Sequence, residues 1–123
     1  MRVLLIEDED HIREIAQLSL ESVAGWETRQ ASGGHEGLAL AASEHPDAIL
    51  LDVMMPDLDG PGTLARLRAD PATADIPVVF LTAKTRTSER QELQELGAAG
   101  VIKKPFDPMS LAAQVAEILG WTL

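Results

Sequence analysis

Short apolar runs alternate along the chain with longer stretches in which apolar residues recur every three or four positions. A short apolar run is typical of a strand buried on both faces, and the wider spacing is typical of an amphipathic helix. The pattern predicts strands near residues 2–7, 27–31, 47–52, 76–82 and 100–103. It predicts helices near residues 10–24, 34–45, 61–69, 85–96 and 108–119. This alternation favours an α/β domain whose parallel sheet carries helices on both faces.

The apolar positions also indicate which face of a helix is buried. Those of the predicted first, fourth and last helices are Ile12, Ala16, Leu20 and Val23, then Leu93 and Leu96, then Leu111, Val115, Ile118 and Leu119. Most of them recur at intervals of three or four residues, which places each set on one face. A glycine, a residue that often ends a helix, stands behind each segment, at Gly25, Gly97 and Gly120.

Carboxylates stand where two of the predicted strands end. Glu7 and Asp8 follow the apolar run 3–6, and Asp52 follows the apolar run 48–51. Parallel α/β sheets bind ligands at their carboxyl edge, so acids at strand ends predict a site rather than a charged surface. The periodicity does not give the strand order. An order of 2-1-3-4-5 would put strands 1 and 3 side by side and bring Asp8 close to Asp52.

Three carboxylates so close together would repel one another and raise one another's pKa values. A divalent cation removes the repulsion, and a few hard oxygen ligands with room for water favour Mg²⁺ over Zn²⁺. We therefore expect Glu7, Asp8 and Asp52 to hold Mg²⁺. The alternative is that Glu7 and Asp8 only lie at the positive end of the first helix.

The other polar residues at strand ends suit phosphoryl chemistry. A carboxylate such as Asp52 can attack phosphorus and form an aspartyl phosphate. Such a transfer depends on neutralising the phosphoryl oxygens, and Lys104 would supply a charge while Thr82 supplies a hydrogen bond. We favour Lys104 over the adjacent Lys103, because Pro105 restricts the backbone of Lys104 and can form a cis bond with it. Lys103 stays the alternative.

Composition limits the function further. The 123 residues, 46% of them apolar, suffice for a single domain over residues 1–123 with one core. The net charge of −10 opposes direct nucleic-acid binding, because phosphate contacts rely on Lys and Arg. There is no cysteine for a disulfide or a thiolate metal site. We see neither a membrane-spanning run nor a signal-peptide layout, and therefore expect a cytoplasmic location.

Four segments together resemble the receiver domain of two-component response regulators, over residues 3–119. They are Leu4-Leu-Ile-Glu-Asp8-Glu, Ile49-Leu-Leu-Asp52-Val-Met-Met-Pro56-Asp-Leu-Asp-Gly60, Val78-Val-Phe-Leu-Thr82-Ala and Lys104-Pro-Phe106. The resemblance implies a doubly wound, flavodoxin-like fold: a five-stranded parallel sheet of order 2-1-3-4-5 with five helices. It implies a signalling switch rather than an enzyme. A sensor histidine kinase or a histidine phosphotransfer protein would give its phosphoryl group to Asp52, and the domain would catalyse only this transfer and its own dephosphorylation.

The resemblance also implies roles for single residues. Asp8 would bind Mg²⁺ directly, Glu7 through a water molecule, and Met54 through its backbone carbonyl. Thr82 and Lys104 would hold the phosphoryl group and transmit its arrival to a downstream protein or to an output domain absent from this chain. The chain would then be either a protein that works alone or a part of a longer regulator.

Other positions suggest how the switch is tuned. Many receivers carry tyrosine or phenylalanine where this chain has Val101, so we expect loop or backbone movement in place of a rotating ring. Met54 and Lys84, each two positions beyond a residue that would contact phosphate, are expected to set the phosphoryl lifetime. Ile15 and Leu18 would contact a kinase helix bundle or, alternatively, pack against a neighbouring helix.

Two other classes of function stand as alternatives. A phosphohydrolase with an aspartyl nucleophile needs a second acid two residues further on, and this chain has Met54 there. An interaction module of the same fold that is never phosphorylated usually lacks an acid, the lysine or the hydroxyl residue. This chain has all of them.

Overall fold

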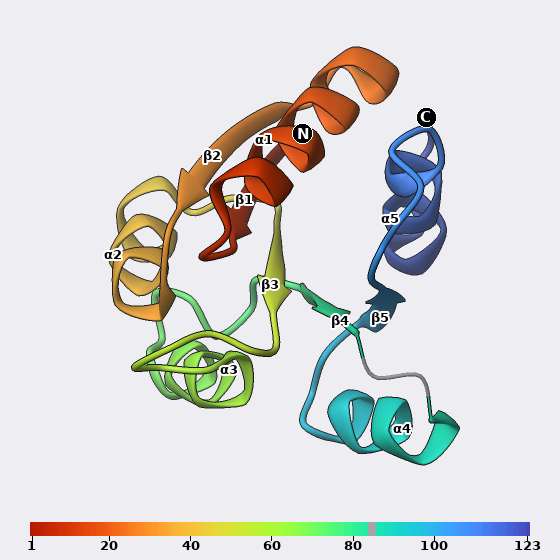
Figure 1. The fold of residues 1–123 in the computed structure, drawn as a ribbon. Coiled ribbons are helices and arrows are strands. Elements are labelled where there is room, and N and C mark those ends of the chain that lie inside the picture. Colours follow the sequence, from red (N-terminus) through yellow and green to blue (C-terminus); the bar gives the residue numbers. More distant parts are fainter. Residues whose placement is uncertain (84–85) are drawn as a thin grey trace.

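Strands and helices alternate along the chain in the predicted order, as the computed structural model shows for residues 1–83 and 86–123 (Figure 1). The strands are β1 (Arg2–Ile6), β2 (Glu27–Ala31), β3 (Ala48–Asp52), β4 (Val78–Thr82) and β5 (Gly100–Lys103). The helices are α1 (Asp10–Ser19) with its π-helical continuation η1 (Leu20–Ala24), α2 (Gly34–Glu44), α3 (Gly60–Ala69), α4 (Thr87–Glu95) and α5 (Leu111–Leu119). None of the helices in these residues is long and apolar enough to cross a membrane.

All five strands of the described residues form one parallel sheet of order β2-β1-β3-β4-β5, which confirms the expected order. β1 pairs with β2 on one side and with β3 on the other. The chain therefore winds in opposite directions from the centre of the sheet. Such a switch point opens a crevice at the carboxyl ends of β1 and β3.

Each face of the sheet has its own buried core. On one face, side chains of β1, β3 and β4 such as Ile49 and Phe80 pack with Ala41 of α2, Leu64 of α3 and Leu93 of α4. On the other face, alternate residues of the same strands pack with α1, η1 and α5. β3 and β4 are buried along their whole length, which explains why both appear in the sequence as unbroken apolar runs.

Two residues on the predicted apolar faces of helices are exposed. The last turn before Gly25 is π-helical and contains more residues than an α-helical turn. Ala24 consequently packs against the core, whereas Val23 is exposed. Leu96 follows the last turn of α4 as its C-cap and is also exposed. Of these two leucines, only Leu93 is buried and packs α4 against the sheet.

Two helices, α4 and α5, begin two or three residues later than predicted. α5 begins at Leu111 rather than near 108, because a turn precedes it: Asp107 accepts the Met109 N–H through its carboxylate and the Leu111 N–H through its carbonyl. α4 begins at Thr87. The predicted start at residue 85, and Lys84 with its expected effect on phosphoryl lifetime, lie outside the described residues.

Candidate functional site

The register of the sheet brings the predicted site residues to one edge. β1 and β3 pair so that Glu7, the first residue after β1, lies beside Asp52, the last residue of β3. Thr82 ends β4, and Lys104 directly follows β5. The Lys104 N–H donates a hydrogen bond to the Thr82 carbonyl at 2.7 Å, which ties these two strand ends together. Residues far apart in sequence therefore meet at the switch point.

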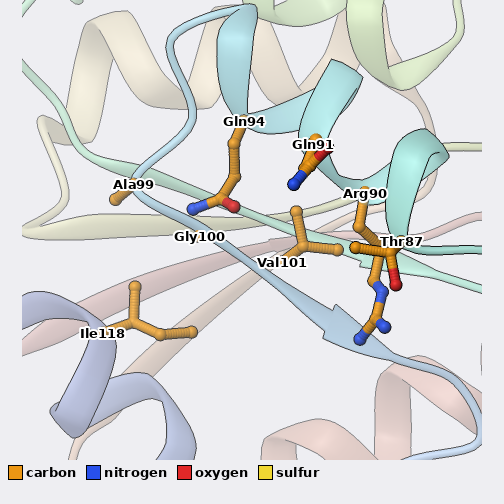
Figure 2. Close-up of a pocket in the computed structure, with 8 residues that line it drawn as sticks. All are labelled: Thr87, Arg90, Gln91, Gln94, Ala99, Gly100, Val101 and Ile118. Atoms are coloured by element: carbon orange, nitrogen blue, oxygen red, sulfur yellow. The ribbon is translucent and has the colours of Figure 1, made fainter.

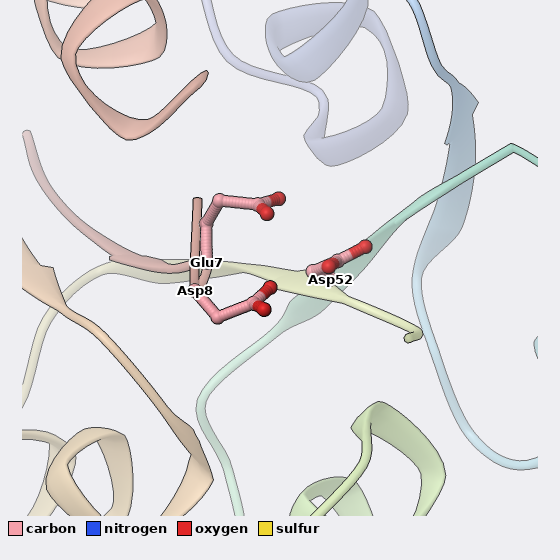
Figure 3. A group of neighbouring side chains, drawn as sticks. All are labelled: Glu7, Asp8 and Asp52. Carbon is pink, nitrogen blue, oxygen red and sulfur yellow. The ribbon is translucent and has the colours of Figure 1, made fainter. Parts of the chain in front are cut away.

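The three predicted metal ligands form a single cluster of carboxylates. Each of Glu7, Asp8 and Asp52 offers an oxygen, and these oxygens all lie within 4.8 Å of one another. Figure 3 shows the three side chains leaving neighbouring strand ends toward the same space. Glu7 is 2% exposed and Asp52 3%, while Asp8 is more open to solvent. The cluster thus has a buried part and an accessible side.

Lys104 contacts this cluster, and Lys103 does not. The Lys104 Nζ atom lies 3.0 Å from Asp52 Oδ1 and 3.2 Å from Glu7 Oε2, and its side chain is only 15% exposed. Lys103 is exposed. The Lys104–Pro105 bond is cis. Of the two adjacent lysines, only Lys104 has the position that its predicted role requires.

Burial and mutual repulsion perturb the ionisation of the cluster. Burial and the neighbouring Asp52 charge raise the pKa of Glu7 to about 7, although Lys104 opposes the shift. Burial also raises the pKa of Asp52, again against the effect of Lys104. Burial acts to lower the pKa of Lys104, but Asp52 and Glu7 outweigh it and raise that pKa. The contact with one ammonium group therefore does not outweigh the effect of burial on these two carboxyl groups.

This arrangement fits a hard divalent cation. Carboxylate oxygens in small number, with an accessible side for water, are the ligands that Mg²⁺ prefers. Burial opposes the ionisation of Glu7 and Asp52 and so raises their pKa values, and a bound cation would favour their charged forms. Glu7 also accepts the N–H of Glu9, the N-cap of α1, at 3.3 Å. The helix-start contact considered as an alternative is thus present beside the cluster, not instead of it.

Sequence reasoning missed two groups that support the site. The Arg13 guanidinium of α1 donates to the Glu7 carbonyl oxygen at 2.7 Å and also contacts Asp10, so it holds the loop that carries Glu7. Asp59 caps α3 by accepting the Gly62 N–H at 2.8 Å. The sequence does contain a signal for the Asp59 cap, namely an acid followed by Gly-Pro. It contains no signal for the contact between Arg13 and the Glu7 carbonyl.

The remaining predicted residues take varied positions. Thr82 is buried at the end of β4, while the Met54 side chain is 69% exposed in the loop after β3. Val101 lies half-buried on β5 and packs against the core that faces α2, α3 and α4. Ile15 and Leu18 are both exposed on α1, and Ile15 also lines a small hollow with Pro105 and Phe106.

Known proteins are similar to this chain in sequence and in fold. The family model of the response regulator receiver domain matches residues 3–116. The probable transcriptional regulator ycf27 of Porphyridium aerugineum and the DNA-binding dual master transcriptional regulator RpaA of Synechocystis sp. are each 40% identical over 118 residues, which is 96% of this chain and 48% of theirs. The chain therefore spans about half the length of these curated relatives.

Solved structures of response regulators are also similar to this chain. The chemotaxis protein CheY4 of Vibrio cholerae has a TM-score of 0.87 at 32% identity, covering 95% of this chain and 97% of that one. A putative response regulator from Chloroflexus aurantiacus also has a TM-score of 0.87, at 35% identity, covering 97% of both chains. With the strand order and the family match, these similarities show that the chain belongs to the response regulator receiver domain family, whose members act in two-component signalling.

Proposed function

We propose that Asp52 accepts a phosphoryl group from a phosphohistidine donor in a Mg²⁺-dependent reaction. The observation that carries this proposal is the contact of Lys104 with a buried Asp52, beside two further acids at the sheet edge. The acids Glu7 and Asp8 would hold the cation with Asp52 and the Met54 carbonyl, Glu7 through water. Bound there, Mg²⁺ would neutralise negative charge on the carboxylates and on the phosphoryl oxygens.

The side chains present suit the bond changes of this transfer. An oxygen of the Asp52 carboxylate would attack phosphorus, the P–N bond of the donor would break, and the donor imidazole would leave with the electron pair. Lys104, already 3.0 Å from Asp52 Oδ1, would offer its ammonium to the incoming phosphoryl oxygens. Thr82 would donate its hydroxyl to the same group. The resulting change would reach a downstream protein or output domain.

A surface beside the site supports a protein donor. Ile15 and Leu18 expose apolar side chains on α1. Ile15, with Pro105 and Phe106, lines a small apolar hollow of about 130 Å³ that also includes Lys104. An amphipathic donor helix resting on this surface would bring a histidine close to Asp52. The cytoplasmic location expected from the sequence stays a prediction.

The test supplies two donors, acetyl phosphate and a phosphorylated histidine phosphotransfer protein, and weighs the intact chain. With Mg²⁺ we expect a gain of one phosphoryl group from either donor, lost in Asp52→Asn and kept in the control Asp57→Asn, which changes an exposed acid in the loop that follows β3. Leu18→Asp should slow only transfer from the protein donor. A chain that gains no mass from any donor, or an Asp52→Asn variant that still gains it, would refute the proposal.

The alternative functions receive less support. Met54 offers an exposed thioether where an aspartyl phosphohydrolase needs an acid that moves a proton. A module that has lost phosphorylation would have no need to keep Lys104 buried against Asp52 and Glu7. Steady turnover of a phosphate ester would favour the first alternative, and failure of Mg²⁺ to bind the folded chain would favour the second.

A further inference from the structure

The loop between β1 and α1, which carries Glu7 and Asp8, is held by a guanidinium group as well as by the sheet. The Arg13 Nη1 atom donates to the Glu7 carbonyl oxygen at 2.7 Å, and its Nη2 atom contacts Asp10 Oδ1 at 2.6 Å. The Arg13 Nε atom donates to Gln30 Oε1 at 3.0 Å. Only 14% of the Arg13 side chain is exposed. The three nitrogen atoms of this guanidinium therefore join α1, the loop and β2.

The bond to the Glu7 carbonyl orients the peptide unit from which Asp8 extends. A peptide bond is planar, so a fixed carbonyl oxygen at Glu7 also fixes the plane in which the N and Cα atoms of Asp8 lie. The Glu7 N–H meanwhile donates to the Ala31 carbonyl of β2 at 3.1 Å. Both backbone polar groups of Glu7 are thus connected to β2, one directly and the other through Arg13 and Gln30.

Further polar contacts hold Gln30 in turn. Its side-chain amide donates to Gln17 Oε1 of α1, and Gln17 donates to Glu21 Oε2 at 3.4 Å. Thr28 of β2 also donates to Glu21 Oε2, at 2.7 Å. The helical members recur every four residues and the strand members every two, so they face one another along one line. We call this set the α1–β2 seam; its members are Arg13, Gln17, Glu21, Thr28 and Gln30.

An arginine on a helix beside the sheet does not need such contacts. Arg90 of α4 is likewise half-buried, and it lines a cavity of about 370 Å³ beside β5 (Figure 2). Its Nε atom is buried and has no hydrogen-bond partner within the described residues. Each nitrogen atom of the Arg13 guanidinium, in contrast, has an acceptor. Placement on a helix beside the sheet therefore does not by itself explain the contacts of Arg13.

We propose that Arg13 is a positioning residue of the Mg²⁺ site, which sets the Mg²⁺ affinity by holding the peptide unit between Glu7 and Asp8. The inference rests on the proposed function in that these acids bind Mg²⁺. The charge of Arg13 alone predicts the opposite effect, because a guanidinium group near the carboxylates repels a divalent cation and its removal would strengthen binding. Removal of a group that orients the ligands weakens binding, since the loop must then be ordered when the cation binds.

The experiment titrates the metal-free intact chain with MgCl₂ at pH 8 and follows binding by NMR. We expect Arg13→Gln to weaken Mg²⁺ binding about tenfold, as is typical when a group that orients a metal ligand is lost. Gln30→Met changes no charge and should weaken binding by a smaller factor, because Arg13 then loses one of its three contacts. Arg90→Gln removes the same charge from a half-buried helix position and should not weaken binding.

A second measurement needs no metal. The Glu9 N–H donates to Glu7 Oε1 at 3.3 Å, and Arg13→Gln should speed its hydrogen exchange in the metal-free chain. Amides of β3 report the stability of the whole fold, so unchanged exchange there would separate a loosened loop from a loss of fold. Arg13→Lys keeps one donor for the Glu7 carbonyl but not the planar fork, and should restore only part of the Mg²⁺ affinity.

The two signs of the effect decide the outcome. Equal or tighter Mg²⁺ binding by Arg13→Gln, or unchanged exchange of the Glu9 N–H in that variant, would overturn the inference. If Arg13→Gln does not fold, Gln30→Met takes its place, and equal or tighter binding by that variant would overturn the inference as well. A chain that shows all the expected changes in Mg²⁺ affinity but gains no phosphoryl group would refute the previous proposal and support this one.

Discussion

Among single residues of the described site, Lys104 contributes most to compensating the charge of the carboxylates. Its ammonium contacts two nearly buried carboxylates, at 3.0 Å for Asp52 and 3.2 Å for Glu7. Removing one member of a buried ionic cluster leaves the remaining charges without compensation, which costs more than the loss of a surface pair. The adjacent Lys103 is exposed, so the two neighbours form a natural comparison.

We expect Lys104→Met to lower the free energy of unfolding by about 3 kcal/mol at pH 8 without Mg²⁺. The loss should shrink toward pH 5.5, because Glu7, whose pKa is about 7, then becomes protonated and carries no charge. Urea titrations at the two pH values measure both quantities. The control Lys103→Met should change stability by less than about 0.5 kcal/mol; equal effects of the two substitutions would mean that the lysine contacts contribute nothing.

At the scale of elements, the close approach of α3 to β3 positions Asp52. Gly60 begins α3, and a Cβ atom on it would lie 2.5 Å from the Asp52 carbonyl oxygen and 2.8 Å from the Val53 Cα atom. The Gly60 N–H also donates to the Val53 carbonyl at 2.9 Å. These contacts involve backbone, which cannot rotate away as a side chain can. Only a glycine allows this helix to begin so close to the strand that carries Asp52.

We therefore expect Gly60→Ala to destabilise the domain by about 2 kcal/mol or more and to slow phosphoryl uptake by displacing Asp52. Gly62→Ala, two residues further along α3, is the matched control. A Cβ atom there would meet the end of the flexible Leu58 side chain at 2.9 Å and the Asp59 carboxylate at 3.0 Å, and alanine favours the helix by about 1 kcal/mol. Thermal unfolding that ranks Gly62→Ala as the more damaging substitution would contradict this account.

Across the molecule, the two ends of the sheet differ in their chemistry. The carboxyl edge gathers charges that repel, while the opposite end is closed by apolar contacts such as the edge-to-face packing of Trp26 and Trp121, with ring centres 5.1 Å apart. Glu7 has a higher pKa in the folded chain than its usual 4.5, so the folded state binds more protons than the unfolded state between these values. Ionising Glu7 therefore destabilises the metal-free fold.

For the metal-free protein we expect stability relative to Glu7→Gln to fall as pH rises from about 4.5 to about 7, by an amount on the order of 2 kcal/mol. Comparison with the variant isolates Glu7 from the other acids. Adding Mg²⁺ should stabilise the wild type more at pH 8 than at pH 5.5, since it binds the ionised carboxylates. Chemical denaturation across this range measures both effects.

The control for this comparison is Glu92→Gln, which removes an exposed acid of α4. Its stability relative to wild type should show no such decline between pH 4.5 and 7. If the stability of the wild type did not fall relative to that of Glu7→Gln over this range, or did not rise with Mg²⁺ at pH 8, the expected cost of ionising Glu7 in the metal-free fold would be contradicted.

The fold and the members of the candidate site could largely be predicted from local patterns. Unbroken apolar runs such as Ile49–Leu51 predict buried parallel strands, and polar residues at their ends predict an edge site. The exact faces of helices were less predictable. Val23 is exposed because η1 widens the helix, and no residue type in that segment signals a π-helical turn. The contact between Arg13 and the Glu7 carbonyl was missed because it depends on how α1 is oriented relative to the end of β1.

Local periodicity thus suffices for the kinds of element, their order and the residues at strand ends, because burial and alternation act over a few neighbouring positions. Strand order came only from the chemistry of the acids and the family resemblance. Two features depend on residues brought together from distant segments: the distances between Lys104 and its two carboxylates, and the raised pKa of Glu7. Such contacts arise only when the packed sheet joins segments that the chain itself keeps apart.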